Sequence, residues 1–324
     1  MMEWSDRHCR YLHRLISKKT LLYTEMVTAH ALTHAPADYV ERRLLGYSPE
    51  EHPIALQLGG SEPETLAEAV RIAVPFGYDE INLNVGCPSD RVQSGAFGAC
   101  LMRESELVAR CCEAMIAASD AAGGPEITVK CRIGVDEQDP DVVLPAFLQA
   151  ISSAGIRAVT IHARKAWLKG LSPKENRDIP PLDYALVRRM KDDFPGLQIV
   201  LNGGVTSIWL AATHLTEGFD GVMIGRAAYH HPIDVLGRAD NVIFDAESPP
   251  ADPFKIARAM IPYAETRLAL GDKLSHITRH MLGLFHGAPG ARGWRRILTV
   301  AAAKAGAAPE LIETALEGIA PFET

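Results

Sequence analysis

The sequence predicts an α/β fold and, within that class, a (β/α)8 TIM barrel followed by a small all-helical domain. Seven short β-branched or apolar runs recur, and a helix-like stretch or a loop follows each of them. Continuous apolar runs are typical of strands buried on both faces, as in parallel sheets. The seven runs are LLYTEMV (21–27), PIALQLG (53–59), EINLNVG (80–86), ITVKCRI (127–133), AVTIHAR (158–164), QIVLNGG (198–204) and GVMIGRA (221–227). Their alternation with helical segments indicates a parallel sheet covered by helices.

Amphipathic segments between these runs, such as PETLAEAVRIAV (63–74) and ESELVARCCEAMIAA (104–118), are predicted crossover helices. The sequence contains neither G-x-G-x-x-G nor G-x-x-x-x-G-K-[ST], so both common phosphate signatures of open doubly wound sheets are missing. Polar residues gather instead where the runs end: Gln57, Asn84, Lys130, Arg132, His162, Arg164, Asn202 and Arg226. Polar chemistry at the carboxyl ends of many strands favours a barrel over an open sheet.

The two ends of the chain predict its domain organisation. A barrel needs eight strands, and the chain enters a helix directly after MMEW, with Ser5 or Asp6 as the N-cap. We therefore expect the first strand to be mostly missing, which would leave an exposed sheet edge. The Pro-rich stretch ESPPADP (247–253) indicates a linker. The expected organisation is a barrel over 1–246, a linker over 247–251 and a helical domain over 252–324.

Bulk composition is that of an ordinary soluble protein. The 324 residues are 47% hydrophobic and 23% charged, which allows a large core. No apolar run approaches the roughly 18 residues needed to cross a bilayer, and the N-terminus has no apolar signal segment, so we expect a cytoplasmic protein. The six cysteines show no C-x-x-C pair or zinc-ligand spacing, which favours reduced thiols.

The net charge of −7 argues mildly against nucleic acid as a partner, but the charge is unevenly distributed. The stretch between Arg267 and Lys304 carries seven Lys/Arg and a single acid, Asp272. Such a stretch is either a footprint for phosphates or a solvated helical face. The segments GARGWRR (290–296) and RKAWLKGLSPKENR (164–177) combine basic residues with a tryptophan, which suits phosphate contacts and base stacking as well as solvated loops.

Glycines end the last two predicted strands in NGG (202–204) and GR (225–226). The loops after strands seven and eight form the usual phosphate site of barrels, where backbone N–H groups and a helix N-terminus hold the anion. Thr206 or Ser207 is placed to begin that helix. The alternative is that these glycines serve only as turn residues.

Lys130 lies within a strand that is otherwise apolar. Burying an ammonium group without a partner costs several kcal/mol. We therefore expect the Lys130 side chain to reach an anionic ligand at the barrel mouth. A reduced flavin fits, because a fixed cation stabilises the negative charge at its pyrimidine end. His162 ends the following strand and could contact phosphate or substrate, although a lone strand histidine is more often a core residue.

The segment NVGCPSDRVQSGAFGACLM (84–102) holds the candidate catalytic residue, Cys87, in a Gly-rich loop that follows a strand. A thiol is largely protonated at neutral pH and can act as a general acid. Neither the adjacent base that a nucleophile needs nor the companions that a metal ligand needs are evident nearby. HITRH (276–280), with His286 beyond it, could bind zinc but lacks the Glu of H-E-x-x-H; His230–His231 is interpreted in the same way, so no metal is expected.

Together these residues resemble the tRNA-dihydrouridine synthase family, specifically its A type. The matching stretches span nearly the whole chain and include NLNVGCPSDRVQ, TVKCRIG, IHARKAWLKGLSPKENRDIPPLDY, NGGV, DGVMIGRAAY and HITRHMLGLFHGAPGARGWRR. The resemblance implies an FMN-containing barrel, a helical tRNA-binding domain and NADPH as the reductant. For the A type it implies uridines 20 and 20a of the tRNA D-loop as targets.

The resemblance also implies roles for individual residues. Cys87 matches the catalytic cysteine. The flavin-binding positions match Met1, Met2, Gln57, Lys130 and His162, and the FMN phosphate site matches Asn202, Gly203, Gly204, Gly225 and Arg226. The proline that precedes the two methionines in the family pattern is absent here. The tRNA-contacting positions match Asn84, Lys174, Arg177, Arg292 and Arg295.

Three other functions remain open at this stage. One is an FMN barrel acting on a free pyrimidine or a small enone, which the basic helical domain disfavours. Another is an RNA-binding module with an inactive barrel, which the intact site residues disfavour. The last is a flavin-free aldolase that uses Lys130 as a Schiff base. For the expected enzyme we predict a monomer that binds neither metal nor membrane.

Overall fold

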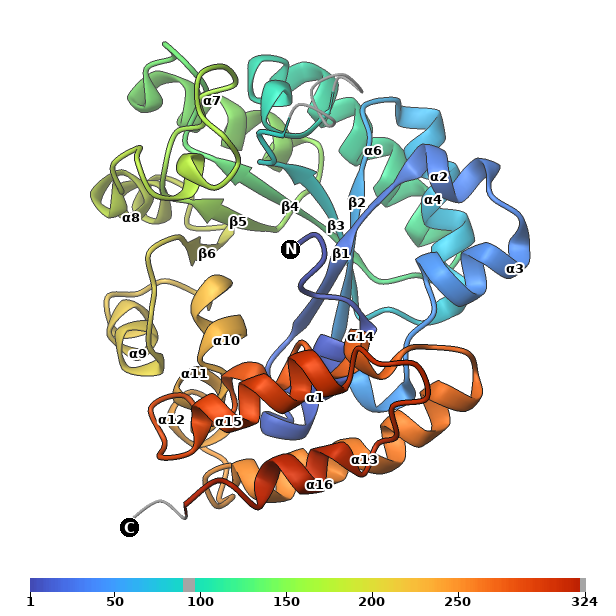
Figure 1. The fold of residues 1–324 in the computed structure, drawn as a ribbon. Helices are drawn as coiled ribbons and strands as arrows, with labels where there is room; N and C mark the ends of the chain where they lie inside the picture. The colour runs from blue at the N-terminus through green and yellow to red at the C-terminus, as the bar shows by residue number, and fades with distance from the viewer. Residues whose placement is uncertain (90–96, 321–324) are drawn as a thin grey trace.

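The computed structural model describes residues 1–89 and 97–320, and its centre is a curled sheet of seven parallel strands (Figure 1). The strands lie in the sheet in the order of the sequence. They are β1 (Leu22–Thr28), β2 (Ile54–Gly59), β3 (Glu80–Val85), β4 (Glu126–Arg132), β5 (Ala158–His162), β6 (Gln198–Asn202) and β7 (Gly221–Met223). All seven predicted strands are confirmed, and the barrel-like α/β class with them.

The register of the strands places polar residues side by side near their carboxyl ends. Asn84 on β3 pairs with Lys130 on β4. Two residues further along β4, Arg132 pairs with His162 on β5, and His162 pairs with Asn202 on β6. Because all strands are parallel, their carboxyl ends meet at one edge of the sheet, and residues far apart in sequence become neighbours there.

Helices cover the outer face of the sheet (Figure 1). They are α2 (Ala29–His34), α3 (Ala37–Tyr39), α4 (Pro63–Ala73), α6 (Ser105–Ala121), α7 (Pro140–Ser153), α8 (Tyr184–Asp193) and α9 (Ile208–Thr216). The two predicted crossover helices correspond to α4 and α6. In α4, Pro63 occupies the first turn, where no N–H is needed, and the buried face carries Leu66 and Val70 at i, i+4 spacing.

The N-terminal residues lie between β1 and the end of β7. The backbone N–H of Glu3 donates to the carboxylate of Glu25 on β1, while the Met1 sulfur lies 3.3 Å from where a Cβ on Gly225 would be. Trp4 stacks on Tyr229 with ring centroids 4.6 Å apart. Residues 1–4 therefore occupy the opening between the two sheet edges as a turn, and the described strands include no β7–β1 pair.

Helix α1 (Arg7–Ile16) follows this turn, and Asp6 rather than Ser5 is its N-cap. The Asp6 carboxylate accepts hydrogen bonds from the backbone N–H groups of His8 and Cys9, at 3.0 Å each. Such a cap satisfies two of the donors that a helix start leaves without partners.

The described chain after β7 is helical, and the predicted helical character of the C-terminal region is confirmed. Its helices are α10 (Arg226–His230), α11 (Pro232–Leu236), α12 (Ala239–Val242), α13 (Pro253–Ala269), α14 (Leu274–Thr278), α15 (Ala291–Arg296) and α16 (Leu311–Leu316). Residues 247–251 form neither helix nor strand, and Asp252 caps α13. No described helix has both the length and the apolar character that crossing a membrane requires.

A second hydrophobic core, separate from the core around the sheet, joins these helices except α12, whose Ala239 belongs to a third cluster. It includes Trp294 and Phe285, and also Leu12 of α1 and Val235 of α11. The helical segment therefore packs against α1 and α11 rather than standing alone. Trp294 is only 1% exposed, and its indole N–H donates to the Met281 carbonyl at 3.0 Å. The prediction that an RNA base stacks on this tryptophan is therefore wrong, because burial in the core leaves neither face of the ring free.

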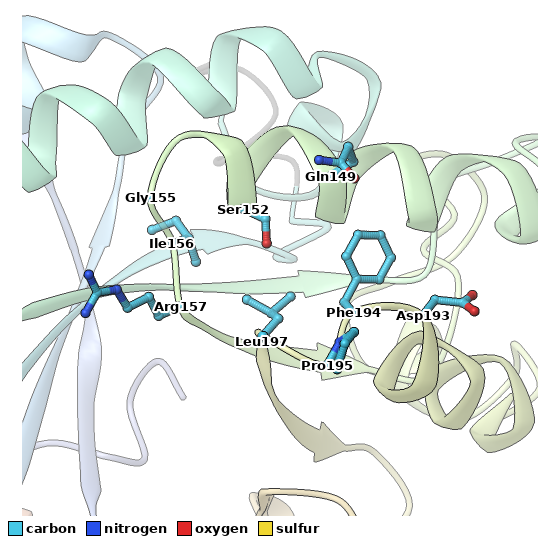
Figure 2. A pocket seen from close by; sticks show the side chains of 10 residues that line it. Gln149, Ser152, Gly155, Ile156, Arg157, Asp193, Phe194, Pro195 and Leu197 are labelled. Atoms are coloured by element: carbon cyan, nitrogen blue, oxygen red, sulfur yellow. The ribbon is translucent and has the colours of Figure 1, made fainter.

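A surface pocket of about 410 Å³ lies at the amino ends of β5 and β6 (Figure 2). Ser152 of α7 lines it together with Ile156, Phe194 and Leu197 from the segments that lead into the two strands. This is the end of the sheet opposite to the polar residues described above. Conservation and chemistry in barrels concentrate at the carboxyl end, so we assign this pocket no part in the candidate site.

Candidate active site

A chain of hydrogen bonds runs through the interior of the sheet from the half-buried carboxylate of Glu80. Thr128 Oγ1 donates to Glu80 Oε1 at 2.6 Å, and Asn82 Nδ2 donates to Thr128 Oγ1 at 2.8 Å. Gln57 Nε2 then donates to Asn82 Oδ1 at 2.9 Å. The Tyr23 hydroxyl donates to the same carboxylate oxygen. Because that oxygen accepts only, each amide in the chain is held with its N–H₂ group toward Glu80.

The chain continues to the loop that carries Cys87. Asn84 Nδ2 donates to Gln57 Oε1 at 2.8 Å, which leaves Asn84 Oδ1 to accept the backbone N–H groups of Gly86 and Cys87 at 3.1 and 3.0 Å. The Cys87 thiol is half-buried and lies 3.6 Å from the Ser89 hydroxyl. The core network therefore determines the backbone position of Cys87. The remainder of this predicted loop, 90–96, lies outside the described residues.

Arg132 joins the Cys87 loop to the basic loop 164–177. Its Nε donates to the Gly86 carbonyl at 3.0 Å, and its Nη1 donates to the carbonyls of Lys165 and Asn176 at 3.1 and 2.8 Å. The side chain is 3% exposed, and burial lowers its pKa to about 10. The sequence placed Arg132 at a strand end but did not reveal this role, because its three acceptors are backbone carbonyls in distant segments.

Lys130 is held by an amide, and no carboxylate among the described residues is its hydrogen-bond partner. Its Nζ donates to Asn202 Oδ1 at 3.1 Å, and Asn202 Nδ2 donates to the Met223 carbonyl at 2.8 Å. Burial, followed by repulsion from Arg132, lowers the Lys130 pKa to about 8. At neutral pH the ammonium therefore keeps most of its charge, and no acid within residues 1–89 and 97–320 forms an ion pair with it. This is the environment expected of a cation that binds an anionic ligand.

Gly203, the first glycine after β6, is packed against His162. Gly203 has φ +107°, and a Cβ there would lie 2.5 Å from His162 Cδ2, so only glycine fits. The Gly203 carbonyl accepts the Tyr184 hydroxyl at 2.6 Å. Burial and four nearby cations hold the His162 pKa well below its usual value, which keeps the imidazole neutral. Ser207 caps α9, as predicted for the helix after NGG.

Positive charge dominates this edge of the sheet. The cations whose charge lowers the pKa of His162 are Arg132, Lys130, Arg164 and Arg177. Arg226 forms an ion pair with Asp178 at 2.7 Å and also donates to the Arg177 carbonyl. Arg164 Nε is buried and has no hydrogen-bond partner in the described structure. The orphaned guanidinium nitrogen of Arg164 and the ammonium of Lys130, which both act on His162, suit an anionic, phosphate-bearing ligand.

The remaining predicted residues are distributed more widely. Met1 lies beside Gly225, whereas Met2 is 60% exposed. Lys174 is exposed, and Arg177 is half-buried. Arg292 and Arg295 are exposed on α15, within the helical part of the chain.

Ion pairs reduce the predicted basic cluster between Arg267 and Lys304. Arg267 pairs with Asp272 and Arg279 pairs with Asp6, both at 2.5 Å. The exposed basic residues that remain are Lys273, Arg292, Arg295, Arg296 and Lys304. The surface available for phosphates is therefore smaller than the sequence indicated, and α15 supplies most of it.

The chain matches the family model for dihydrouridine synthase (Dus) over residues 1–320. Among curated proteins it is 55% identical to a tRNA-dihydrouridine(20/20a) synthase of Salmonella typhi, over 99% of this chain and 93% of the relative. It is 54% identical to a protein of the same name from Escherichia coli (strain K12), over 99% and 90% of the two chains. A Vibrio cholerae protein of that name is 53% identical over the whole chain and 95% of the relative.

Proposed function

Because this chain belongs to the dihydrouridine synthase family, we propose that it reduces the C5=C6 bond of uridine in the tRNA D-loop, at positions 20 and 20a. NADPH is the reductant and FMN the bound cofactor in this proposal. The observation that carries it is the placement of Cys87 by Asn84 and Arg132 at the edge of a cationic, ligand-binding site. The names of the relatives support the same reaction and the same substrate.

The residues at the carboxyl edge are suited to hold FMN. Lys130, fixed by Asn202, is placed to stabilise negative charge on the pyrimidine end of the ring, and Gln57 presents an oriented amide nearby. The phosphate would be held by Gly203, Gly204, Gly225 and Arg226, with His162 beside them and Met1 and Met2 at the open side of the sheet. Reduced FMN, when bound, supplies the hydride that adds to C6 of the uracil ring.

Cys87 is the proton donor in this scheme. Hydride addition at C6 leaves an enolate, because C5=C6 is conjugated to the C4 carbonyl, and the electron pair then collects at C5. The thiol gives its proton to C5 and becomes a thiolate. Lys130, Arg132 and Arg177 interact electrostatically with Cys87, so the negative charge left on sulfur develops beside fixed cations.

The target uridine must leave the base stack of the tRNA to reach this thiol, and unstacking one base costs a few kcal/mol. Asn84 and Arg177 are the residues proposed to contact the extruded base, together with Lys174 from the adjoining loop. Arg292 and Arg295 on α15 are suited to the folded RNA backbone, which proteins recognise by shape and phosphate. The helical region over 252–324 is therefore the proposed tRNA-binding domain, joined by 247–251 to the barrel over 1–246.

NADPH is proposed to visit the flavin transiently before tRNA binds. Kinetics that require a ternary complex with both substrates bound would contradict this order. A cytoplasmic monomer is the proposed working form, in keeping with a tRNA substrate.

The decisive variant is Cys87→Ala, with Cys100→Ala as the matched control. Cys100 is also half-buried, and its thiol donates to the Phe97 carbonyl outside the proposed reaction. Both variants should retain the yellow flavin spectrum. Only Cys87→Ala should fail to restore dihydrouridine, mapped in tRNA from a strain that lacks its own synthase. Turnover equal to wild type in Cys87→Ala would refute the proton-donor role.

The same preparations separate the alternative functions. Activity on free uracil comparable with activity on tRNA would favour a small-molecule flavoenzyme. A colourless protein that binds tRNA would favour an RNA-binding module. A covalent adduct at Lys130, trapped with borohydride in the presence of a carbonyl substrate, would favour an aldolase.

A further inference from the structure

Two histidines and an aspartate meet on the surface where the end of α10 approaches the segment after a short helical turn, Met281–Gly283. His231 follows α10, Asp234 lies in the first turn of α11, and His286 comes from the C-terminal region. One ligand atom from each lies within 4.8 Å of the other two. The two imidazole rings are in contact, with centroids 4.0 Å apart and planes at 68°.

The histidine that anchors this group has an unsatisfied polar atom. Nδ1 of His231 is buried and has no hydrogen-bond partner within residues 1–89 and 97–320. Buried polar atoms are nearly always paired, so an unpaired imidazole nitrogen indicates a missing ligand or solvent molecule. Asp234 and His286 are exposed, which leaves the outer side of the group open.

We propose that His231, Asp234 and His286 form a binding site for a zinc-class divalent metal ion. Two imidazoles and one carboxylate suit zinc, nickel, cobalt or copper, whereas magnesium and calcium prefer oxygen ligands alone. With a water in the fourth position, the set is that of a three-ligand tetrahedral site. This site is distinct from the histidines of HITRH, where His276 is exposed while His280 contacts Asp6 at 3.0 Å.

The distances are compatible with binding after small side-chain rotations. Around a tetrahedral zinc, ligand atoms about 2.0–2.1 Å from the metal are about 3.3–3.5 Å from one another. The atoms here, within 4.8 Å, must therefore approach by at most roughly 1.5 Å. Because Asp234 and His286 are exposed, their side chains can rotate by this amount while helix α11 and the turn that carries His286 stay in place.

A bound ion would join two parts of the proposed enzyme. Helix α10 begins at Arg226 in the proposed phosphate site and ends next to His231. His286 is followed by a short loop and then by α15, which carries Arg292 and Arg295. The metal would thus hold the end of the barrel and the basic helix in a fixed relation. Metal binding itself does not depend on the proposed reaction.

The test uses the full-length protein, with its flavin, expressed without a polyhistidine tag and treated with EDTA. Zinc chloride is titrated by calorimetry, bound zinc is counted by mass spectrometry, and thermal unfolding is followed with and without zinc. The variants are His286→Gln and Asp234→Asn, both at exposed positions, with His276→Gln as the control outside the cluster. Cys87→Ala excludes the catalytic loop as the zinc ligand.

We expect about one zinc per chain in the wild type, in His276→Gln and in Cys87→Ala, with affinity at least about tenfold weaker in the two cluster variants. A hundredfold excess of zinc over its Kd should raise the Tm by roughly 3–8 °C, and magnesium chloride should not. Absence of stoichiometric zinc binding would overturn the proposal. So would wild-type affinity in His286→Gln, or loss of zinc in Cys87→Ala alone.

Discussion

Replacing Asn82 with leucine tests the hydrogen-bond chain that connects Glu80 to the catalytic loop. Leucine has nearly the same shape, so the substitution removes polarity without opening a large cavity. Asn82 is fully buried, and its loss leaves Gln57 Nε2 and Thr128 Oγ1 each with one partner fewer. A buried polar atom without its partner costs about 1–3 kcal/mol, so the free energy of unfolding should fall by about 2–6 kcal/mol.

The loss should also reach the active site. Without Asn82, the Gln57 side chain keeps only its hydrogen bond from Asn84, so the chain holds the Gln57 amide from one side instead of two. We therefore expect weaker FMN retention and lower turnover at saturating tRNA, in addition to reduced stability. Stability is measured by urea unfolding at a fixed FMN concentration, because a bound ligand stabilises the folded state. Flavin content is read from visible absorbance.

Gln149→Leu is the matched control. Gln149 is exposed on α7, and it forms a single hydrogen bond, to Ser153. This variant should change the free energy of unfolding by less than about 0.5 kcal/mol. If Asn82→Leu lost less than about 1 kcal/mol, or kept full flavin binding and turnover, the idea of one continuous positioning chain would be refuted.

Three further outcomes are expected. FMN affinity should fall as pH rises through about 8, because the Lys130 ammonium is present below its lowered pKa and is lost above it. In Asn202→Asp this fall in FMN affinity should move to higher pH. An unchanged pH profile, measured by flavin titration, would contradict the assignment. Arg132→Met should lower the free energy of unfolding by about 2–4 kcal/mol and reduce turnover while flavin stays bound, since three loop carbonyls lose a charged donor. Urea unfolding and dihydrouridine assays measure the two effects, and wild-type values in both would disprove the prediction. Arg295→Gln should lower the slope of log Kd for tRNA against log salt concentration by about 0.7–0.9. The control is Arg258→Gln, which should leave the slope unchanged because the Arg258 guanidinium is paired with Glu313 in the wild type. Equal slopes in the two variants would show that Arg295 does not contact the RNA.

The sequence by itself determined the strands and their order along the chain, and it indicated the candidate site residues. Each strand is a continuous apolar run bounded by helical periodicity, and burial on both faces makes such runs easy to recognise. Cys87 and Lys130 were identifiable because a thiol in a Gly-rich loop and a lysine inside an apolar strand are locally unusual. The glycine at position 203 was predicted from its motif, and its positive φ gives the physical reason.

Only the tertiary structure decided which side chains act together. It showed that Asn202 is the partner of Lys130, that Arg132 joins two loops, and that Trp294 belongs to the core rather than to an RNA surface. It also brought His231 next to His286. These relations depend on parallel register and helix packing, which join residues tens of positions apart. The local sequence pattern predicts which face of a helix or strand is buried, but it does not predict which other residues that face contacts.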